Sequence, residues 1–129
     1  MADPWPHYLA AHVDIDFEGG RRTYVPGASA GLPEGAAPPL WIITACNPGG
    51  EQRAEEENAR QNERLRHAVE AADWRFWAAV GRNAEGTWQE ASIAVAGAPP
   101  DAVLALAREF GQDAVFRLDE AGLAVVPAG

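Results

Sequence analysis

The sequence contains no lysine and a single cysteine among its 129 residues. All ten basic residues are arginines, which excludes two kinds of site that need lysine: a Schiff base with a carbonyl compound, and a phosphate-binding loop of the Gly-Lys-Ser/Thr type. Nineteen acidic residues bring the net charge to −9, and a negative surface opposes binding to nucleic-acid phosphates. We therefore expect no nucleic-acid partner.

Long apolar stretches are also lacking. No segment is apolar over the length that a membrane-spanning helix needs, and residues 1–6 lack the basic start and apolar core of a signal peptide. The lone Cys46 cannot form a disulfide within the chain, which fits a reducing compartment. It ends the apolar run Leu40–Cys46, so we expect a buried, unreactive thiol. These features predict a soluble cytoplasmic protein with no membrane association.

The length is typical of one domain, here residues 1–129, and the hydrophobic pattern predicts eight structural elements. Six strands are expected at 8–17, 40–46, 74–80, 87–96, 114–119 and 123–126, with helices at 51–72 and 101–110. The resulting order β-β-α-β-β-α-β-β is rich in hairpins. It predicts an α+β fold, with two helices packed on a mainly antiparallel sheet. Residues 19–39 are rich in Gly, Ala and Pro and predict a long irregular loop.

Three polar clusters interrupt otherwise apolar segments. They are Thr44–Pro48 with Asn58, Arg60 and Asn62 shortly after it, then Trp88–Ser92, then Phe110–Ala114. Burial of amides and charged groups is costly unless they are hydrogen-bonded. These clusters are therefore expected to form a polar network or to line a site. Eight residues make up that prediction: Asn47, Asn58, Arg60, Asn62, Trp88, Glu90, Ser92 and Gln112.

The long helix departs from simple amphipathic patterning. Leu65 and Val69 lie on the apolar stripe of its second half. Projected back toward the start of the helix, this stripe meets the amides Asn58, Gln61 and Asn62 rather than aliphatic residues. We expect the first half of the helix to turn these amides toward the body of the protein.

Glu90 is the best candidate for a chemically active group. Alternation along its strand places it on one face with Trp88 and Ser92, where burial could raise its pKa and suit it to general acid or base catalysis. A structural ion pair with Arg60, joining helix to sheet, is the favoured alternative.

Alternation along the first strand places Val13, Ile15 and Phe17 on one face and a possible metal-binding set on the other. His12, Asp14 and Asp16 carry ligand groups suited to a divalent cation. Such residues more often form the solvated face of an edge strand. We therefore expect neither a metal nor a cofactor.

Several of these motifs together resemble a known family. They are Asn47-Pro48, Asn58 with Arg60, Trp88 with Glu90 and Ser92, and the run Phe110–Ala114. In order and spacing, from about residue 41 to 116, they resemble the bacterial family catalogued as domain of unknown function 3293. The resemblance implies a small bacterial domain and no particular activity.

Three classes of function are compatible with the sequence. The first is a binding or regulatory module that recognises a small polar ligand or a protein partner in a pocket between the long helix and the sheet. The second is a small enzyme that uses Glu90 as general acid or base. The third is a protein–protein interaction domain whose polar network is purely structural. The first is preferred, because neither fold nor family supplies a reaction.

Overall fold

The structure is a computed structural model that describes residues 8–28 and 31–129. Two predictions from the sequence fall partly or wholly outside these ranges. One is the absence of a signal peptide at residues 1–6, and the other is the loop at 19–39, of which residues 29–30 are not described. The described chain forms, in order, β1 (His12–Phe17), β2 (Gly20–Tyr24), β3 (Leu40–Ile43), the short 3-10 helix η1 (Pro48–Gly50), α2 (Glu55–Ala71), β4 (Arg75–Arg82), β5 (Gln89–Ala96), α3 (Pro100–Glu109), β6 (Ala114–Asp119) and β7 (Gly122–Pro127).

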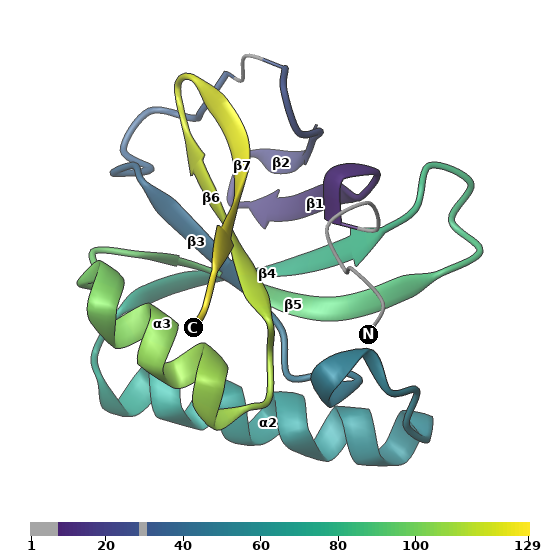
Figure 1. Ribbon diagram of the computed structural model, residues 1–129. Coiled ribbons are helices and arrows are strands. Elements are labelled where there is room, and N and C mark those ends of the chain that lie inside the picture. Colours follow the sequence, from purple (N-terminus) through teal and green to yellow (C-terminus); the bar gives the residue numbers. More distant parts are fainter. Residues whose placement is uncertain (1–7, 29–30) are drawn as a thin grey trace.

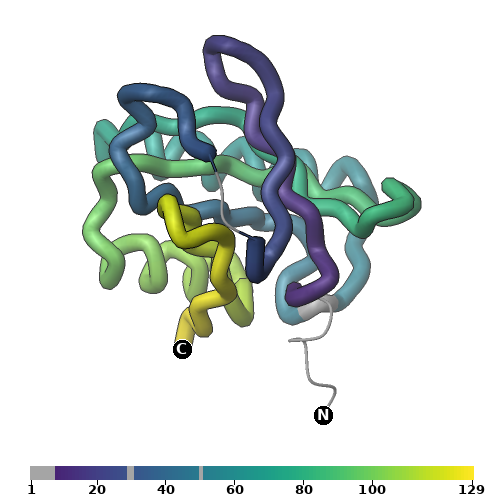
Figure 2. The backbone as a smooth tube through the Cα atoms, turned by 90° about the horizontal axis from the view of Figure 1, so that it is seen from above, coloured from purple at the N-terminus to yellow at the C-terminus, as the bar shows by residue number. Residues whose placement is uncertain are grey.

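The seven strands form one antiparallel sheet in the order β2-β1-β4-β5-β3-β6-β7. The sheet curls so that the β1–β2 and β6–β7 hairpins lie on the same side of it, while α2 and α3 cover the opposite side (Figures 1 and 2). The predicted α+β class, the antiparallel sheet and the two packed helices are confirmed. No helix in the described ranges is long and apolar enough to cross a membrane.

The predicted order of elements was wrong by one strand, because the loop expected at 19–39 begins with β2. A two-residue turn at Glu18-Gly19 pairs Phe17 with Gly20 and carries the chain back along β1. The strand was missed because Arg21 and Arg22 give it no apolar alternation, and its first four residues are exposed. Charged side chains are common on such edge strands, where they discourage pairing with other chains.

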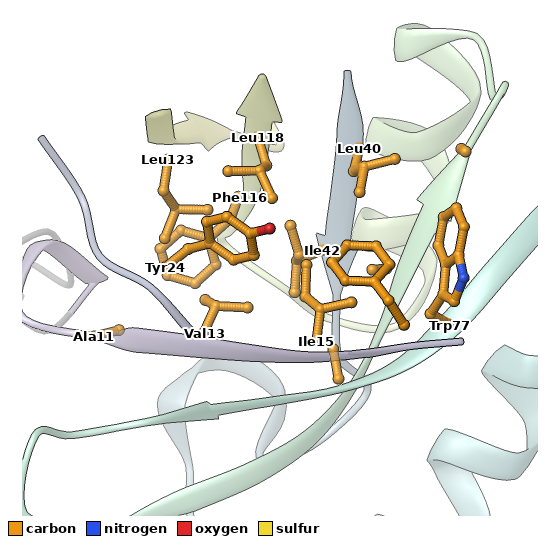
Figure 3. Close-up of a cluster of buried hydrophobic side chains, with 14 residues drawn as sticks. Ala11, Val13, Ile15, Tyr24, Leu40, Ile42, Trp77, Phe116, Leu118 and Leu123 are labelled. Atoms are coloured by element: carbon orange, nitrogen blue, oxygen red, sulfur yellow. The ribbon is translucent and has the colours of Figure 1, made fainter. Parts of the chain in front are cut away.

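The apolar run of β3 is unbroken because both faces of this central strand are buried. Leu40 and Ile42 point to the hollow side of the sheet, and Trp41 and Ile43 point to the helices, so all four are buried. On the hollow side, Leu40 and Ile42 join an inner cluster that fills the space between the two hairpins (Figure 3). The inner cluster consists of Ala11, Val13, Ile15, Phe17, Tyr24, Leu40, Ile42, Trp77, Ala79, Ala94, Ala96, Phe116, Leu118 and Leu123.

A second cluster seals the helices to the other face of the sheet. Leu65 and Val69 of α2 and Val103 and Ala107 of α3 are almost completely buried there. They recur at the three- and four-residue spacing that keeps side chains on one face of a helix. This helix side of the sheet therefore takes up both amphipathic stripes that the sequence predicts.

Asp14 is a buried carboxylate rather than part of a solvated edge. The strand that carries it lies between β2 and β4, and Asp14 is only 4% exposed. Its carboxylate accepts hydrogen bonds from Thr23 Oγ1 at 2.6 Å and from Arg82 Nε at 2.7 Å. Burial alone would raise the pKa of Asp14, but these bonds and the charges of Arg82 and Arg21 outweigh it and lower the pKa. Asp14, one of the two carboxylates considered as possible metal ligands, is thus bound by side chains of β2 and β4.

This pairing predicts a pH-dependent contribution to stability. Folding lowers the pKa of Asp14, so the ionised Asp14 stabilises the folded state. This stabilisation is fully present at any pH above the pKa of Asp14 in the unfolded chain. It is lost as the pH falls through the lower pKa of the folded state. Asp14→Ala should lower the free energy of unfolding by about 2 kcal/mol at neutral pH, since it leaves Arg82 without its partner. Urea denaturation from pH 7 to pH 3 should show the gap to wild type narrowing in acid. Asp73→Asn, at an exposed carboxylate, serves as the control; a gap that stays constant with pH would contradict the account.

Candidate functional site

The site is organised by the segment that leaves the sheet after β3, which we call the Thr44–Gly49 turn. The backbone N–H groups of this turn have no neighbouring strand to bond to. Pro48 has no N–H, and the N–H groups of Ala45, Cys46, Asn47 and Gly49 each have a hydrogen-bond acceptor. The Cys46 N–H donates to the Thr44 hydroxyl at 3.0 Å, and that hydroxyl in turn donates to the Ala91 carbonyl of β5 at 2.7 Å. Buried backbone groups require such partners, and here side chains and the backbone of Gly111 supply them.

Two amides of α2 hold the turn from the helix side. Asn62 accepts a hydrogen bond from the Ala45 N–H at 2.9 Å and directs its own NH₂ group at the Cys46 sulfur at 2.9 Å. Asn58 accepts from the Asn47 N–H and donates to the Asn47 side-chain oxygen, both at 3.0 Å. The two amides lie one helical turn apart on the face that continues to Leu65. The amide-rich start of the helix stripe therefore faces the protein body, and its amides bind the backbone of the turn.

The segment after α3 holds the turn from the other side. Gln112, 8% exposed, donates to the Cys46 carbonyl at 3.0 Å, and the Gly111 carbonyl accepts from the Gly49 N–H at 2.7 Å. Gly111 has φ +72°, and a Cβ there would lie 2.7 Å from the Pro48 Cβ. A glycine is required on both counts. Two motifs that lie more than 60 residues apart thus meet in one contact.

Asn47 connects this framework to the sheet. It adopts a left-handed backbone conformation with φ 47°, which Asn tolerates better than most residues. Its side-chain oxygen accepts from Asn58 and from the Arg53 N–H at 2.9 Å, which fixes the direction of its NH₂ group. That group donates to Glu90 Oε2 at 2.7 Å. Among the described residues no other side chain hydrogen-bonds to this carboxylate, so Oε1 has no such partner.

A pocket of about 770 Å³ opens beside Glu90, at the end of the sheet where β3 ends and β5 and β6 begin. The turn and the start of α2 form one wall, and side chains on the hollow side of the sheet form the other. The polar lining includes Thr44, Asn47, Asn58, Glu90, Ser92, Gln112 and Asp113, and the apolar and aromatic lining includes Tyr8, Ala11, Ile42, Trp88 and Phe116. The pocket thus lies at the end of α2 and not along its length.

Burial and negative charge shape the ionisation of the pocket. Burial raises the pKa of Glu90, and the hydrogen bond from Asn47 offsets only part of this rise. The pKa of Tyr8 is raised to about 12, chiefly by burial and in smaller part by the negative charges of Asp113 and Glu90. Tyr8 therefore stays neutral at physiological pH, and the potential around it is negative.

The structure gathers most of the predicted site residues. Asn47, Asn58, Trp88, Glu90, Ser92 and Gln112 line the pocket, and Asn62 lies behind it, bound to the turn. Arg60 does not join them. It is exposed on α2, two positions and therefore about 200° around the helix from Asn58. The ion pair expected between Arg60 and Glu90 does not form, and Asn47 takes the place expected of Arg60.

Several residues that shape the site were not among the eight predicted. Tyr8 and Asp113 line the pocket, and Gly111 fixes the contact with Pro48. Gly111 belongs to the Phe110–Ala114 cluster, but its contact with Pro48 was not predicted, although a Gly directly after a helix commonly takes positive φ. Tyr8 had no signal, because nothing in the sequence links this residue, which precedes β1, to residues more than 80 positions away.

Comparison with known proteins agrees with the resemblance seen in the sequence. The family model described as "Protein of unknown function (DUF3293)" matches residues 43–115, which is more than half of the chain. The chain belongs to the DUF3293 family. The match begins at the end of β3 and ends within β6, so it contains the Thr44–Gly49 turn and both of its supports. No curated protein and no solved structure matches the chain.

The hydrogen bonds of Asn62 predict that it stabilises the fold. Asn62→Leu removes the acceptor of the fully buried Ala45 N–H, which should lower the free energy of unfolding by about 2 kcal/mol. Gln61→Leu is the matched control and should have little effect, because in the described part of the chain the neighbouring Gln61 amide is bonded only to Arg64. Thermal melts of both variants measure the difference. Equal melting temperatures for wild type and Asn62→Leu would contradict a structural role.

The contact between Gly111 and Pro48 makes a second prediction. Gly111→Ala should lower the free energy of unfolding by about 2 kcal/mol or more, because the new Cβ meets both a positive φ and Pro48. Gly97→Ala also takes a positive φ, +76°, but meets no atom within 4 Å, so it isolates the backbone strain from the clash. Urea denaturation should show a larger loss for Gly111→Ala. Equal losses would mean that the packing against Pro48 is unimportant.

Proposed function

We propose that this DUF3293 domain is a binding module that holds a small polar ligand in the pocket beside Glu90. One observation carries the proposal: a half-buried carboxylate with one oxygen fixed by Asn47 and the other without a hydrogen bond from any described residue, at the wall of a cavity of about 770 Å³. Pockets of this size, with an apolar lining and a few oriented polar groups, are typical of small-molecule sites. A cytoplasmic, bacterial setting is proposed with it, supported by the single cysteine and by the sequence resemblance.

Most polar residues of the site bond to the protein backbone, whereas Glu90 keeps one oxygen available, and this difference supports a ligand site. Asn58, Asn62 and Gln112 direct their amides at the backbone of the Thr44–Gly49 turn, so their hydrogen bonds serve the fold. Glu90 receives one bond from that framework and keeps an oxygen for another partner. A rigid support with one group left available is the arrangement that orients a ligand without reorganisation.

The two other classes of function have less support in the described residues. A docking surface for a protein would be expected to expose apolar side chains, and Leu9, at 60%, is the one large hydrophobic residue exposed there. A general acid or base needs a second chemical group within hydrogen-bonding reach, and within the described ranges Glu90 is bonded through its side chain only to Asn47. Binding is therefore the preferred proposal.

Blocking the pocket tests the proposal. A Cβ on Gly81, which lines the pocket, would meet nothing closer than the Ser92 hydroxyl at 3.9 Å. Gly81→Val should therefore block the part of the pocket beside Glu90, the residue paired with Gly81, while preserving the strand, since valine is favoured in strands. A library of small amines, amides, carboxylates and phosphates, titrated into ¹⁵N-labelled protein, should contain compounds that shift the NMR signals of Asn47, Trp88 and Gln112. Those shifts should be lost in Gly81→Val.

The control is Gly19→Val, at an exposed turn where a Cβ meets no atom within 4 Å. It should bind the same compounds as wild type. A library that leaves the pocket signals of the wild type unmoved, or binding that survives in Gly81→Val, would contradict the proposed function.

A further inference from the structure

We propose that the ligand of this pocket is a small organic cation that carries N–H donors, such as an amine, amidine or guanidine, and that Oε1 of Glu90 is its anchor. The inference rests on the proposed binding function and adds the chemical class of the ligand. Three independent features carry it: the state of the Glu90 carboxylate, the balance of charge around the cavity, and its aromatic wall.

The first feature is the anchor itself. An ionised carboxylate offers about four lone-pair sites and accepts donors only. Asn47 uses one of the two oxygens, and the oxygen and backbone N–H of Asn47 are in turn bonded to Asn58, which holds the Asn47 NH₂ group in place. Glu90 Oε1 is therefore held in position and is available to accept a hydrogen bond from a ligand. Hydrogen bonds from a cationic N–H to a carboxylate are the strongest that such an oxygen can accept.

The second feature is the charge of the lining. Among the described residues, three acidic residues line the cavity, Glu55, Glu90 and Asp113, against one arginine, Arg53. The Arg53 guanidinium lies 3.5 Å from the carboxylate of Glu51, which is outside the pocket lining. The negative charge of Glu51 therefore offsets part of the positive charge of Arg53. An anionic ligand would thus enter a negative potential, whereas a cation is attracted to it.

The third feature is the aromatic wall. Trp88 lies on the same strand face as Glu90, and its backbone is held by Asn83 through a bond from the Trp88 N–H to the Asn83 side-chain oxygen at 3.1 Å. Tyr8 and Phe116 also line the cavity and pack with ring centroids 5.5 Å apart. Aromatic faces attract cations and accept flat or alkyl groups. A cation with a planar or short apolar body therefore fits this cavity better than a compact metal ion or a phosphate.

Three isosteric compounds separate charge from shape: benzamidine is cationic, benzamide is neutral and benzoate is anionic. Each is titrated into ¹⁵N-labelled full-length protein at pH 7, with the signals of Asn47, Trp88 and Gln112 as the readout. We expect benzamidine to shift these signals and to bind about tenfold or more tightly than benzamide, the fold-change of one charge-assisted hydrogen bond. Benzoate should leave them unmoved.

Glu90→Gln tests the anchor with little change of shape. The new side-chain oxygen still accepts the Asn47 hydrogen bond, so the turn should keep its structure, which the unbound NMR spectrum of the variant verifies. The variant should lose the preference for benzamidine and retain any binding of benzamide. Glu85→Gln removes the same charge from the exposed β4–β5 loop, outside the pocket lining, and should behave as wild type.

The outcomes separate this inference from the proposed function. A preference for benzamidine that disappears in Glu90→Gln and survives in Glu85→Gln supports the inference. Pocket shifts caused equally by all three compounds, or mainly by benzoate, overturn the cationic class and leave the pocket as a binding site. Equal loss in the two variants overturns Glu90 as the anchor. If neither these compounds nor the fragment library shifts the pocket signals, the inference and the proposed function fail together.

Discussion

The hydrogen bonding of the Thr44–Gly49 turn is the constraint on which the rest of the structure depends. The chain leaves the centre of the sheet here, and its N–H groups lose the ladder that served β3. Amides supplied by α2 and by the segment after α3 replace that ladder. A buried N–H without a partner costs about 1–3 kcal/mol, so the turn, the helix start and residues 110–112 must be placed together. The pocket lies where these three segments meet β5.

The sequence predicted the parts of this arrangement that follow from periodicity. The two-residue alternation of β5 placed Trp88, Glu90 and Ser92 on one face, and the spacing of α2 turned Asn58 and Asn62 inward. Periodicity predicts which face of a helix or strand a side chain occupies, but not which residue that side chain contacts. The acceptor for the Asn47 amide is 43 residues away, and only the path of the curled sheet brings it there. Arg60 was misplaced because its proximity to the two amides in the motif was given more weight than its angle around the helix.

Tertiary context overrode local pattern in the N-terminal part of the sheet. β2 is formed by a sequence with two arginines and no apolar alternation, and it exists because β1 offers it a ladder. By covering that side of β1, β2 removes Asp14 from solvent, where the alternation of β1 had placed it. Thr23 of β2 and Arg82 of β4 then satisfy the carboxylate. None of these residues is close to Asp14 in the chain, so a local reading could not anticipate its burial.

Amide hydrogen exchange at the turn tests the central claim most directly. If side-chain amides replace the missing ladder, the N–H groups of Ala45 and Asn47 exchange only when the fold opens cooperatively, at rates close to those of β3. NMR-detected exchange of the unmodified protein in D₂O measures these rates residue by residue. The account predicts protection of Ala45 and Asn47 similar to that of Ile42. Exchange as fast as in the exposed β4–β5 loop would show that the turn is not held by its amides, and the fixed position of Glu90 would lose its physical basis.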